Sequence, residues 1–102
     1  MSGCASSEPY ALRVLGNSMT PEFEEGEVIV IEPGPCIEHG AYVIALHDGE
    51  YIFRQLLVEH QDLFLHALNE EYPTLKIEDR NHIKGRIISK SSGNGRTRKS
   101  YL

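Results

Sequence analysis

The sequence predicts a mostly β domain, a compact coiled sheet with short turns, and two observations lead to this prediction. Apolar and polar residues alternate with a period of two along most of the chain, which is typical of strands with one buried face. Glycine, proline and aspartate interrupt these runs at short intervals, as expected for turns. The predicted strands lie in residues 11–16, 27–32, 41–57 (two strands and a turn), 63–68, 74–77 and 82–89.

The clearest local signal is the Asp48-Gly49 pair. A two-residue hairpin needs positive φ at both central positions, and Asp-Gly supplies this at low cost. We therefore expect Tyr42–His47 to pair with Glu50–Leu57. The run "EPGPCIEHG", residues 32–40, holds too many prolines and glycines for a strand interior and predicts a loop.

Length and composition describe one small domain. The chain has 102 residues, of which 40% are hydrophobic, enough for a single modest core. No window approaches the roughly 20 apolar residues of a membrane span, and the N-terminus lacks the basic-then-apolar order of a secretory signal. We therefore expect a cytoplasmic protein without a membrane partner.

Charge is unevenly distributed along the chain. All 15 acidic residues precede Lys90, and Arg96, Arg98 and Lys99 follow it in a stretch rich in serine and glycine. Such a composition buries too little apolar surface to order itself, so residues 91–102 are predicted to be a flexible basic tail, with a phosphate-binding arm as the alternative. The acidic body argues against nucleic-acid binding by the domain itself.

The two cysteines carry no recognisable pattern. Cys4 lies in the polar lead-in of residues 1–9 and Cys36 in the predicted loop, and their spacing matches neither a metal site nor a disulfide framework. We expect both to be free thiols without a functional role. No other motif supports a metal or an organic cofactor, and none is predicted.

Ser18 stands out in the stretch "GNSMTPEFEEG", residues 16–26. Gly16 permits a tight turn and Pro21 fixes the chain that follows, so Ser18 should project from a strand end near free backbone N–H groups. A serine hydroxyl becomes an effective nucleophile when a base removes its proton and donors stabilise the resulting oxyanion. The alternative is a turn residue without chemistry, because serine is common beside glycine and proline.

A longer pattern surrounds this serine. The stretch "LRVLGNSMTPEFEEGEVIVIEP", residues 12–33, resembles the nucleophile segment of the LexA-type repressor peptidases, which reads hydrophobic-x-V-x-G-x-S-M-x-P-x-F-x-x-G-D. Every element is present except the last, where Glu27 replaces aspartate. Residues 40–77 resemble the family's second block, a strand, a D-G-E hairpin, the strand with the general base, and an L-x-x-L-N-x-x-Y-P segment. "HIKGRIIS" resembles its closing strand.

The resemblance covers roughly residues 10–90 and defines a LexA-like peptidase domain there. It implies the coiled, all-β fold called the β-clip, as in LexA, phage repressors and UmuD. It also implies descent from a Ser/Lys dyad peptidase, with Ser18 as the nucleophile.

The second catalytic position departs from the family pattern. Family members read hydrophobic-x-hydrophobic-Lys-x-Leu after the hairpin, and that lysine deprotonates the serine, whereas this chain reads "YIFRQL" with Arg54 in its place. A buried lysine can lose its proton, but a guanidinium stays protonated, so Arg54 can bind a carboxylate but cannot act as general base. The resemblance therefore implies Ser18 and Arg54 at the catalytic positions, with activity lowered by several orders of magnitude.

Another base could take the place of the lysine. His47 is the first candidate because it lies on the same hairpin as Arg54, although a position beside the turn favours an exposed side chain. The remaining candidates lie further from the pattern: His39, His60, His66, His82, Lys76 and Lys84.

The resemblance also bears on partners. Repressors of this family cleave themselves at an Ala-Gly or Cys-Gly bond in a linker that follows a DNA-binding helix-turn-helix, and this sequence contains neither dipeptide. We expect either a fragment of a longer regulator, with residues 1–9 as a linker remnant, or a free-standing module whose substrate lies elsewhere. The resemblance implies a homodimer, a peptide segment in the groove near Ser18, and DNA contact only through a domain absent from this chain.

Three functions remain open at this point. The preferred one is a catalytically impaired regulatory domain of a phage or stress-response transcriptional regulator. The second is an active serine peptidase that uses Ser18 with a different base. The third is a peptide-binding module in which an extended segment adds to the sheet and Arg54 pairs with a carboxylate.

Overall fold

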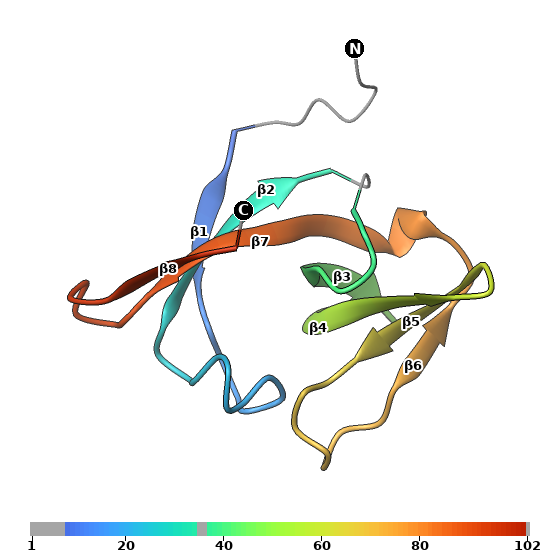
Figure 1. Cartoon of the computed structure of the whole chain (residues 1–102), viewed down its shortest axis with the longest axis horizontal. Helices are drawn as coiled ribbons and strands as arrows, with labels where there is room; N and C mark the ends of the chain where they lie inside the picture. Colours follow the sequence, from blue (N-terminus) through green and yellow to red (C-terminus); the bar gives the residue numbers. More distant parts are fainter. Residues whose placement is uncertain (1–7, 35–36, 102) are drawn as a thin grey trace.

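The described part of the chain forms one antiparallel sheet of eight strands, with a single turn of 3-10 helix (Figure 1). The computed structural model describes residues 8–34 and 37–101, so the predictions for Cys4 and Cys36 fall outside it. The elements are β1 (Tyr10–Arg13), β2 (Val28–Pro33), β3 (Tyr42–His47), β4 (Glu50–Glu59), β5 (Asp62–His66), β6 (Leu75–Ile77), η1 (Arg80–His82), β7 (Ile83–Ser91) and β8 (Arg98–Ser100). The predicted mostly β fold class is confirmed, and the twisted sheet is consistent with a β-clip-like domain.

β7 joins the two halves of the sheet. The strand order is β1-β2-β7-β3-β4-β5-β6, and β8 also pairs with β7. Gly85 lies where β7 pairs with both β2 and β3. A Cβ atom at this position would lie 2.6 Å from Cγ2 of Ile31 and 2.8 Å from the backbone oxygen of Glu32, so only glycine fits without a shift of the backbone.

The predicted hairpin is confirmed. β3 and β4 pair in the register Tyr42 with Gln55 through His47 with Glu50. Asp48 and Gly49 have φ values of 52° and 81°, the positive values that a two-residue turn of this kind requires. β4 extends past the predicted end to Glu59, which lengthens the strand that carries Arg54.

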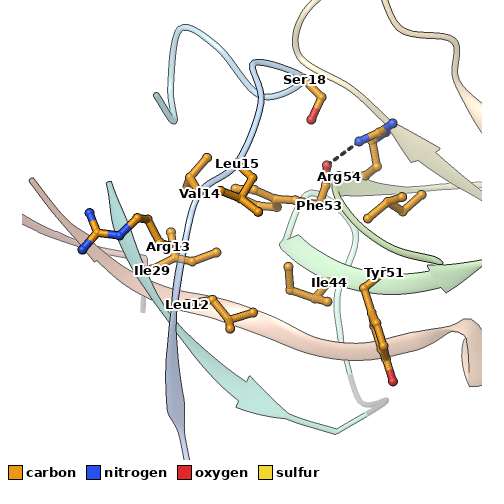
Figure 2. A pocket seen from close by; sticks show the side chains of 11 residues that line it. Leu12, Arg13, Val14, Leu15, Ser18, Ile29, Ile44, Tyr51, Phe53 and Arg54 are labelled. Atoms are coloured by element: carbon orange, nitrogen blue, oxygen red, sulfur yellow. Dashed lines mark hydrogen bonds between the residues drawn. The ribbon is translucent and has the colours of Figure 1, made fainter. Parts of the chain in front are cut away.

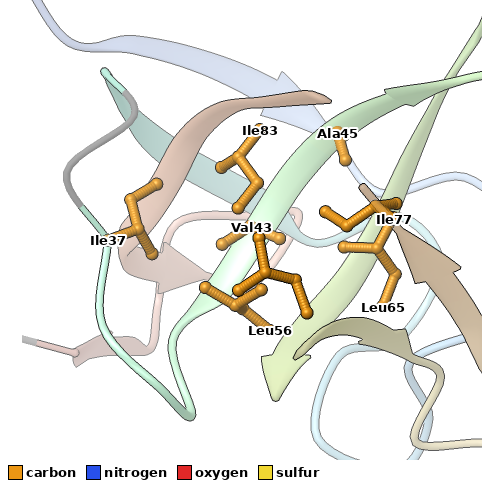
Figure 3. Packing of buried hydrophobic residues seen from close by; sticks show 8 residues of the cluster. Ile37, Val43, Ala45, Leu56, Leu65, Ile77 and Ile83 are labelled. Atoms are coloured by element: carbon orange, nitrogen blue, oxygen red, sulfur yellow. The ribbon is translucent and has the colours of Figure 1, made fainter. Parts of the chain in front are cut away.

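The strands enclose two hydrophobic clusters rather than one. The first lies between β3, β4, β5, β6 and the start of β7 (Figure 3), and consists of Ile37, Val43, Ala45, Leu56, Leu63, Leu65, Ile77 and Ile83. The second lies between β2, β3, β7 and the turn after β1, and consists of Val14, Met19, Phe23, Ile29, Ile31, Ile44 and Ile87. The second cluster holds the segment on which Ser18 is mounted.

The C-terminal segment differs from the flexible tail that the sequence predicted for residues 91–102. β8 pairs with β7, and Tyr101 packs 5.3 Å from both Phe23 and Tyr42, measured between ring centroids. The Tyr101 hydroxyl donates to Oε2 of Glu22 at 2.5 Å. The polar composition did not predict this order, because the segment is held by backbone pairing of β8 with β7 and by packing of a single aromatic residue, Tyr101.

No helix in residues 8–34 and 37–101 is long and apolar enough to cross a bilayer.

Candidate active site

A cavity of about 340 Å³ opens between the N-terminal segment and the β3–β4 hairpin. Its lining is mainly apolar (Figure 2) and consists of Leu12, Arg13, Val14, Leu15, Ser18, Ile29, Ile44, Tyr51, Ile52, Phe53 and Arg54. Ser18 and Arg54 lie at the same end of this lining, and Leu12 and Tyr51 lie toward the other. The structure thus brings the two predicted site residues, 36 positions apart in sequence, to one cavity.

The turn that carries Ser18 is anchored by its apolar neighbours. Met19 and Phe23 are fully buried in the second cluster, and the Phe23 amide donates to the Met19 carbonyl at 2.9 Å. Gly16 has a φ of 78°, a conformation that glycine adopts without strain. Ser18 itself is half-buried, and its hydroxyl has no hydrogen bond within the described residues. The side chain is therefore free to meet a ligand in the cavity.

A second segment, far away in sequence, holds the same turn. Asn69 donates its backbone N–H to the Ser18 carbonyl at 2.9 Å and its side-chain amide to the Asn17 carbonyl at 3.0 Å. The Tyr72 hydroxyl donates to Oδ1 of Asn17 at 2.7 Å. These positioning residues were not assigned a role from the sequence, although both belong to the "LNEEYP" string that carried the resemblance.

Arg54 is a buried cation that has no anionic partner among residues 8–34 and 37–101. It lies on β4 opposite Val43, and only 9% of the residue is exposed. Nη1 donates to the Phe53 carbonyl at 2.8 Å, whereas Nε has no acceptor and no carboxylate pairs with the guanidinium within the described residues. The guanidinium lies 5.4 Å from the centre of the Tyr72 ring. Burial lowers the pKa of Arg54 from its usual value, but a guanidinium keeps its proton in proteins.

The alternative bases do not line this cavity. His39 accepts from the Val58 amide at 2.8 Å, His66 contacts the Thr74 hydroxyl, and His82 contacts the Leu46 carbonyl. The other candidates are likewise absent from the lining: His47, which lies beside Asp48, and His60, Lys76 and Lys84. Among the described residues, the basic side chains in the lining are Arg13 and Arg54. Arg13 points away from the cavity and donates to the Gly26 carbonyl at 3.0 Å.

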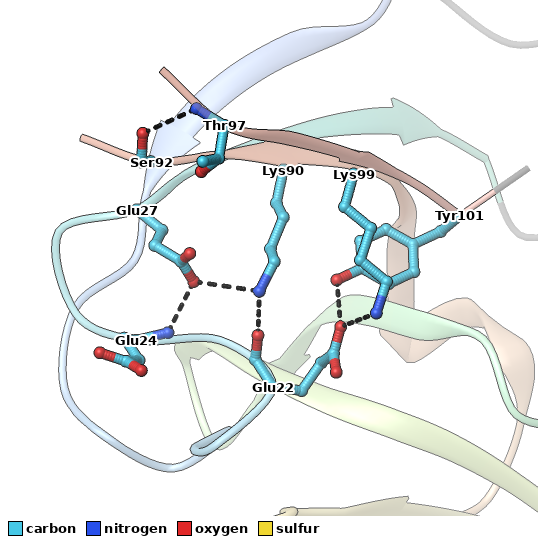
Figure 4. A network of polar contacts seen from close by, with 8 residues as sticks. All are labelled: Glu22, Glu24, Glu27, Lys90, Ser92, Thr97, Lys99 and Tyr101. Carbon is cyan, nitrogen blue, oxygen red and sulfur yellow. Dashed lines mark hydrogen bonds and ion pairs between the residues drawn. The ribbon is translucent and has the colours of Figure 1, made fainter. Parts of the chain in front are cut away.

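The acidic position that differs from the family pattern lies at the end of a turn over residues 24–27, before β2 (Figure 4). Oε1 of Glu27 accepts from the Glu24 amide at 2.8 Å and lies 3.5 Å from Nζ of Lys90. Nζ of Lys90 also donates to the Glu22 carbonyl. Glu27 thus closes the turn by a hydrogen bond to its backbone.

Within the part of the chain that the structure describes, no group of three or more His, Cys, Asp or Glu side chains is arranged to hold a metal ion.

Comparison with known proteins identifies the family. The model of the peptidase S24-like family matches residues 3–88. The chain belongs to the peptidase S24-like family. This S24-like chain is 40% identical over 83 residues to the prophage repressor CohE of Escherichia coli K12. The aligned region covers 78% of the chain and 37% of the repressor.

Two further relatives are regulators. The chain is 34% identical to the HTH-type transcriptional regulator for conjugative element R391 of Providencia rettgeri, over 76% of the chain and 39% of that protein. It is 33% identical to the LexA repressor of Ruegeria sp. TM1040, over 82% of the chain and 36% of the repressor. The S24-like chain therefore spans less than two fifths of the length of these relatives. The resemblance to the LexA-type repressor peptidases is confirmed.

Proposed function

We propose that this S24-like domain is a regulatory domain of a LexA-like or phage-type regulator whose peptidase chemistry is impaired by Arg54. One observation carries the proposal. At the end of the cavity where the Ser18 hydroxyl lies, the neighbouring basic group is the Arg54 guanidinium, which has donors but no lone pair for a proton. Ser18 is then a nucleophile without a base.

The architecture around the serine supports retention of the site without its chemistry. The contacts of Asn69 and Tyr72 hold in place the Asn17-Ser18 turn that carries the hydroxyl. Transfer of the Ser18 proton to Arg54 is not available, because the guanidinium already carries its full complement of protons. A stable, correctly folded domain that binds peptide but reacts slowly is the expected outcome.

Peptide binding in the groove near Ser18 is part of this proposal. β1 pairs with β2 along one edge, and its other edge has no strand partner within the described residues. Residues of β1 and the turn after it line the cavity, and Leu15 is 80% exposed at its rim. An extended segment that added to β1 would place its alternate side chains in this apolar groove.

Assembly and DNA contact are proposed from the relatives. Repressors and HTH-type regulators are among the proteins that the chain resembles, and we expect this domain to contribute homodimerisation in such a regulator. Contact with DNA would belong to a part outside this chain. Sedimentation velocity of the domain tests the first point: a dimer supports it, and a monomer at high protein concentration contradicts it.

A fluorophosphonate probe tests the loss of the base directly. In this reaction the Ser18 oxygen forms a bond to phosphorus, fluoride leaves, and the hydroxyl proton passes to a base. We expect Arg54→Lys to label at Ser18 much faster than the unchanged protein, because desolvation lowers the pKa of a buried lysine toward neutrality. The double variant Ser18→Ala, Arg54→Lys is the control and should not label.

The outcome separates the first two functions. Rapid labelling of Ser18 in the unchanged protein would contradict the proposal and establish an active peptidase with another base. Slow labelling of both proteins, with the fold of Arg54→Lys intact by circular dichroism, would show that more than the base has been lost.

A further inference from the structure

The buried charge of Arg54 has no anionic counterpart in the described residues, and the centre of the Tyr72 ring lies 5.4 Å from the guanidinium. Nη1 donates to the Phe53 carbonyl, and Nε is buried without an acceptor there, so a ligand can approach the guanidinium only at its terminal nitrogens. A buried cation is costly unless an anion compensates it, and a buried donor without an acceptor adds to that cost. A ligand with a negative group is the simplest compensation, and the adjoining cavity is where such a ligand would enter.

The cavity has one polar end and is apolar along the rest of its lining, a distribution that is complementary to the C-terminal end of an apolar peptide. Ser18 and Arg54 form one end, and the remaining lining toward Leu12 and Tyr51 is apolar apart from Arg13, which points away (Figure 2). No acidic side chain lines the cavity among the described residues, so an incoming anion meets no like charge. A ligand with several apolar groups and one terminal anion matches this order.

We propose that the pocket at Ser18 and Arg54 binds the free C-terminal carboxylate of an extended, apolar peptide. The carboxylate accepts hydrogen bonds from the terminal nitrogens of the Arg54 guanidinium, which carry its positive charge and its accessible donors. The Ser18 hydroxyl donates a further hydrogen bond, and the preceding residues run along the free edge of β1. This inference rests on the proposed peptide groove and deepens it by naming the group that is recognised.

A chain terminus fits better than an acidic side chain. In the proposed complex the peptide adds to β1 in the parallel sense, so its last carboxylate continues in the strand direction toward the polar end of the cavity. An acidic side chain would project across that direction and would require the chain to continue past the Ser18 turn. That turn is held in place by the buried Met19 and by Asn69.

Fluorescence anisotropy with three labelled peptides tests the inference. The probes are Leu-Val-Leu-Ala with a free carboxylate, the same peptide with a C-terminal amide, and Leu-Val-Leu-Asp with a C-terminal amide, in which only the side chain is acidic. We expect the free acid to bind about 10- to 100-fold more tightly than either amide, the range for hydrogen bonds to a charged group.

Two variants test whether Arg54 causes the preference for the free acid over the amide. Arg54→Met should remove the difference between free acid and amide, whereas Arg96→Met, which removes the same charge from the exposed turn before β8, should keep it. Equal affinity for free acid and amide, or no saturable binding of the free acid, would overturn the inference. Binding of the aspartyl amide as tight as the free acid would also overturn it, in favour of side-chain recognition.

The test of carboxylate recognition and the test of the lost base can fail separately. Fluorophosphonate labelling of Arg54→Lys measures the missing base and does not depend on what the pocket binds. If Arg54→Lys labels rapidly but the unchanged protein binds the free acid and the amide equally, the proposed loss of the base is supported and the proposed recognition of a carboxylate is contradicted.

Discussion

Replacement of Arg54 by methionine should leave the free domain as stable as before or raise its free energy of unfolding by about 1 kcal/mol. The arginine is 9% exposed, Nε lacks an acceptor, and no carboxylate pairs with the guanidinium within the described residues. An unsatisfied buried donor costs about 1–3 kcal/mol, and more on a charged group, whereas the hydrogen bond from the charged Nη1 to the Phe53 carbonyl returns about 1.5–3 kcal/mol. Methionine keeps most of the apolar stem and removes the uncompensated charge.

Thermal unfolding by circular dichroism or calorimetry measures this effect. For a domain of this size, 1 kcal/mol corresponds to a shift in Tm of roughly 4–8 °C. Arg13→Met is the matched control, because Arg13 is exposed and donates to the Gly26 carbonyl, so its loss should leave Tm unchanged or slightly lower. A fall in Tm of more than several degrees for Arg54→Met would refute the reasoning, because it would mean that the guanidinium is well compensated in the free protein.

Three further predictions concern the support of the site. Gly85→Ala should lower stability by about 1–3 kcal/mol, because the added methyl meets the Glu32 carbonyl oxygen at 2.8 Å; an unchanged urea midpoint would contradict this close approach. Tyr72→Phe should cost about 0.5–1.5 kcal/mol through loss of the 2.7 Å bond to Asn17, and should slow labelling of Ser18 in the Arg54→Lys background. Hydrogen bonds from Lys99 and Tyr101 lower the pKa of Glu22 in the folded protein. The contribution of Glu22 to the free energy of unfolding is therefore present above its ordinary pKa of 4.5 and is lost as the pH falls through the lower pKa of the folded state. Glu22→Gln should therefore lower Tm at pH 7 and reduce its acid dependence, and parallel Tm curves for the two proteins below pH 5 would count against this role.

Local features of the fold were predictable from the sequence, and features that depend on distant contacts were not. The β3–β4 hairpin follows from Asp48-Gly49 and the alternation beside it, both of which are determined within a few residues. The order of β8 was not predicted, because it depends on packing of Tyr101 against Phe23 and Tyr42, residues far away in the chain.

In the site, too, some residues could be named from the sequence, whereas their contacts could not. Ser18 and Arg54 were named through resemblance to a family pattern, since no spacing rule brings the two residues together, and their catalytic roles remain predictions. The contacts of Asn69 and Tyr72 with Asn17 span 52 and 55 residues and needed the folded structure to be seen. The uncompensated charge of Arg54 likewise appears only when the surroundings of the guanidinium are known.

The dependence of the Ser18 labelling rate on pH shows directly whether the site has a working base. Fluorophosphonate labelling is followed by mass spectrometry across neutral and alkaline pH for the unchanged protein and for Arg54→Lys. For Arg54→Lys we expect a rate that rises through an inflection as the buried lysine loses its proton, and for the unchanged protein a slow rate without such an inflection. An inflection near neutral pH in the unchanged protein, lost in Ser18→Ala, would reveal a working base and contradict the claim that Arg54 has replaced it.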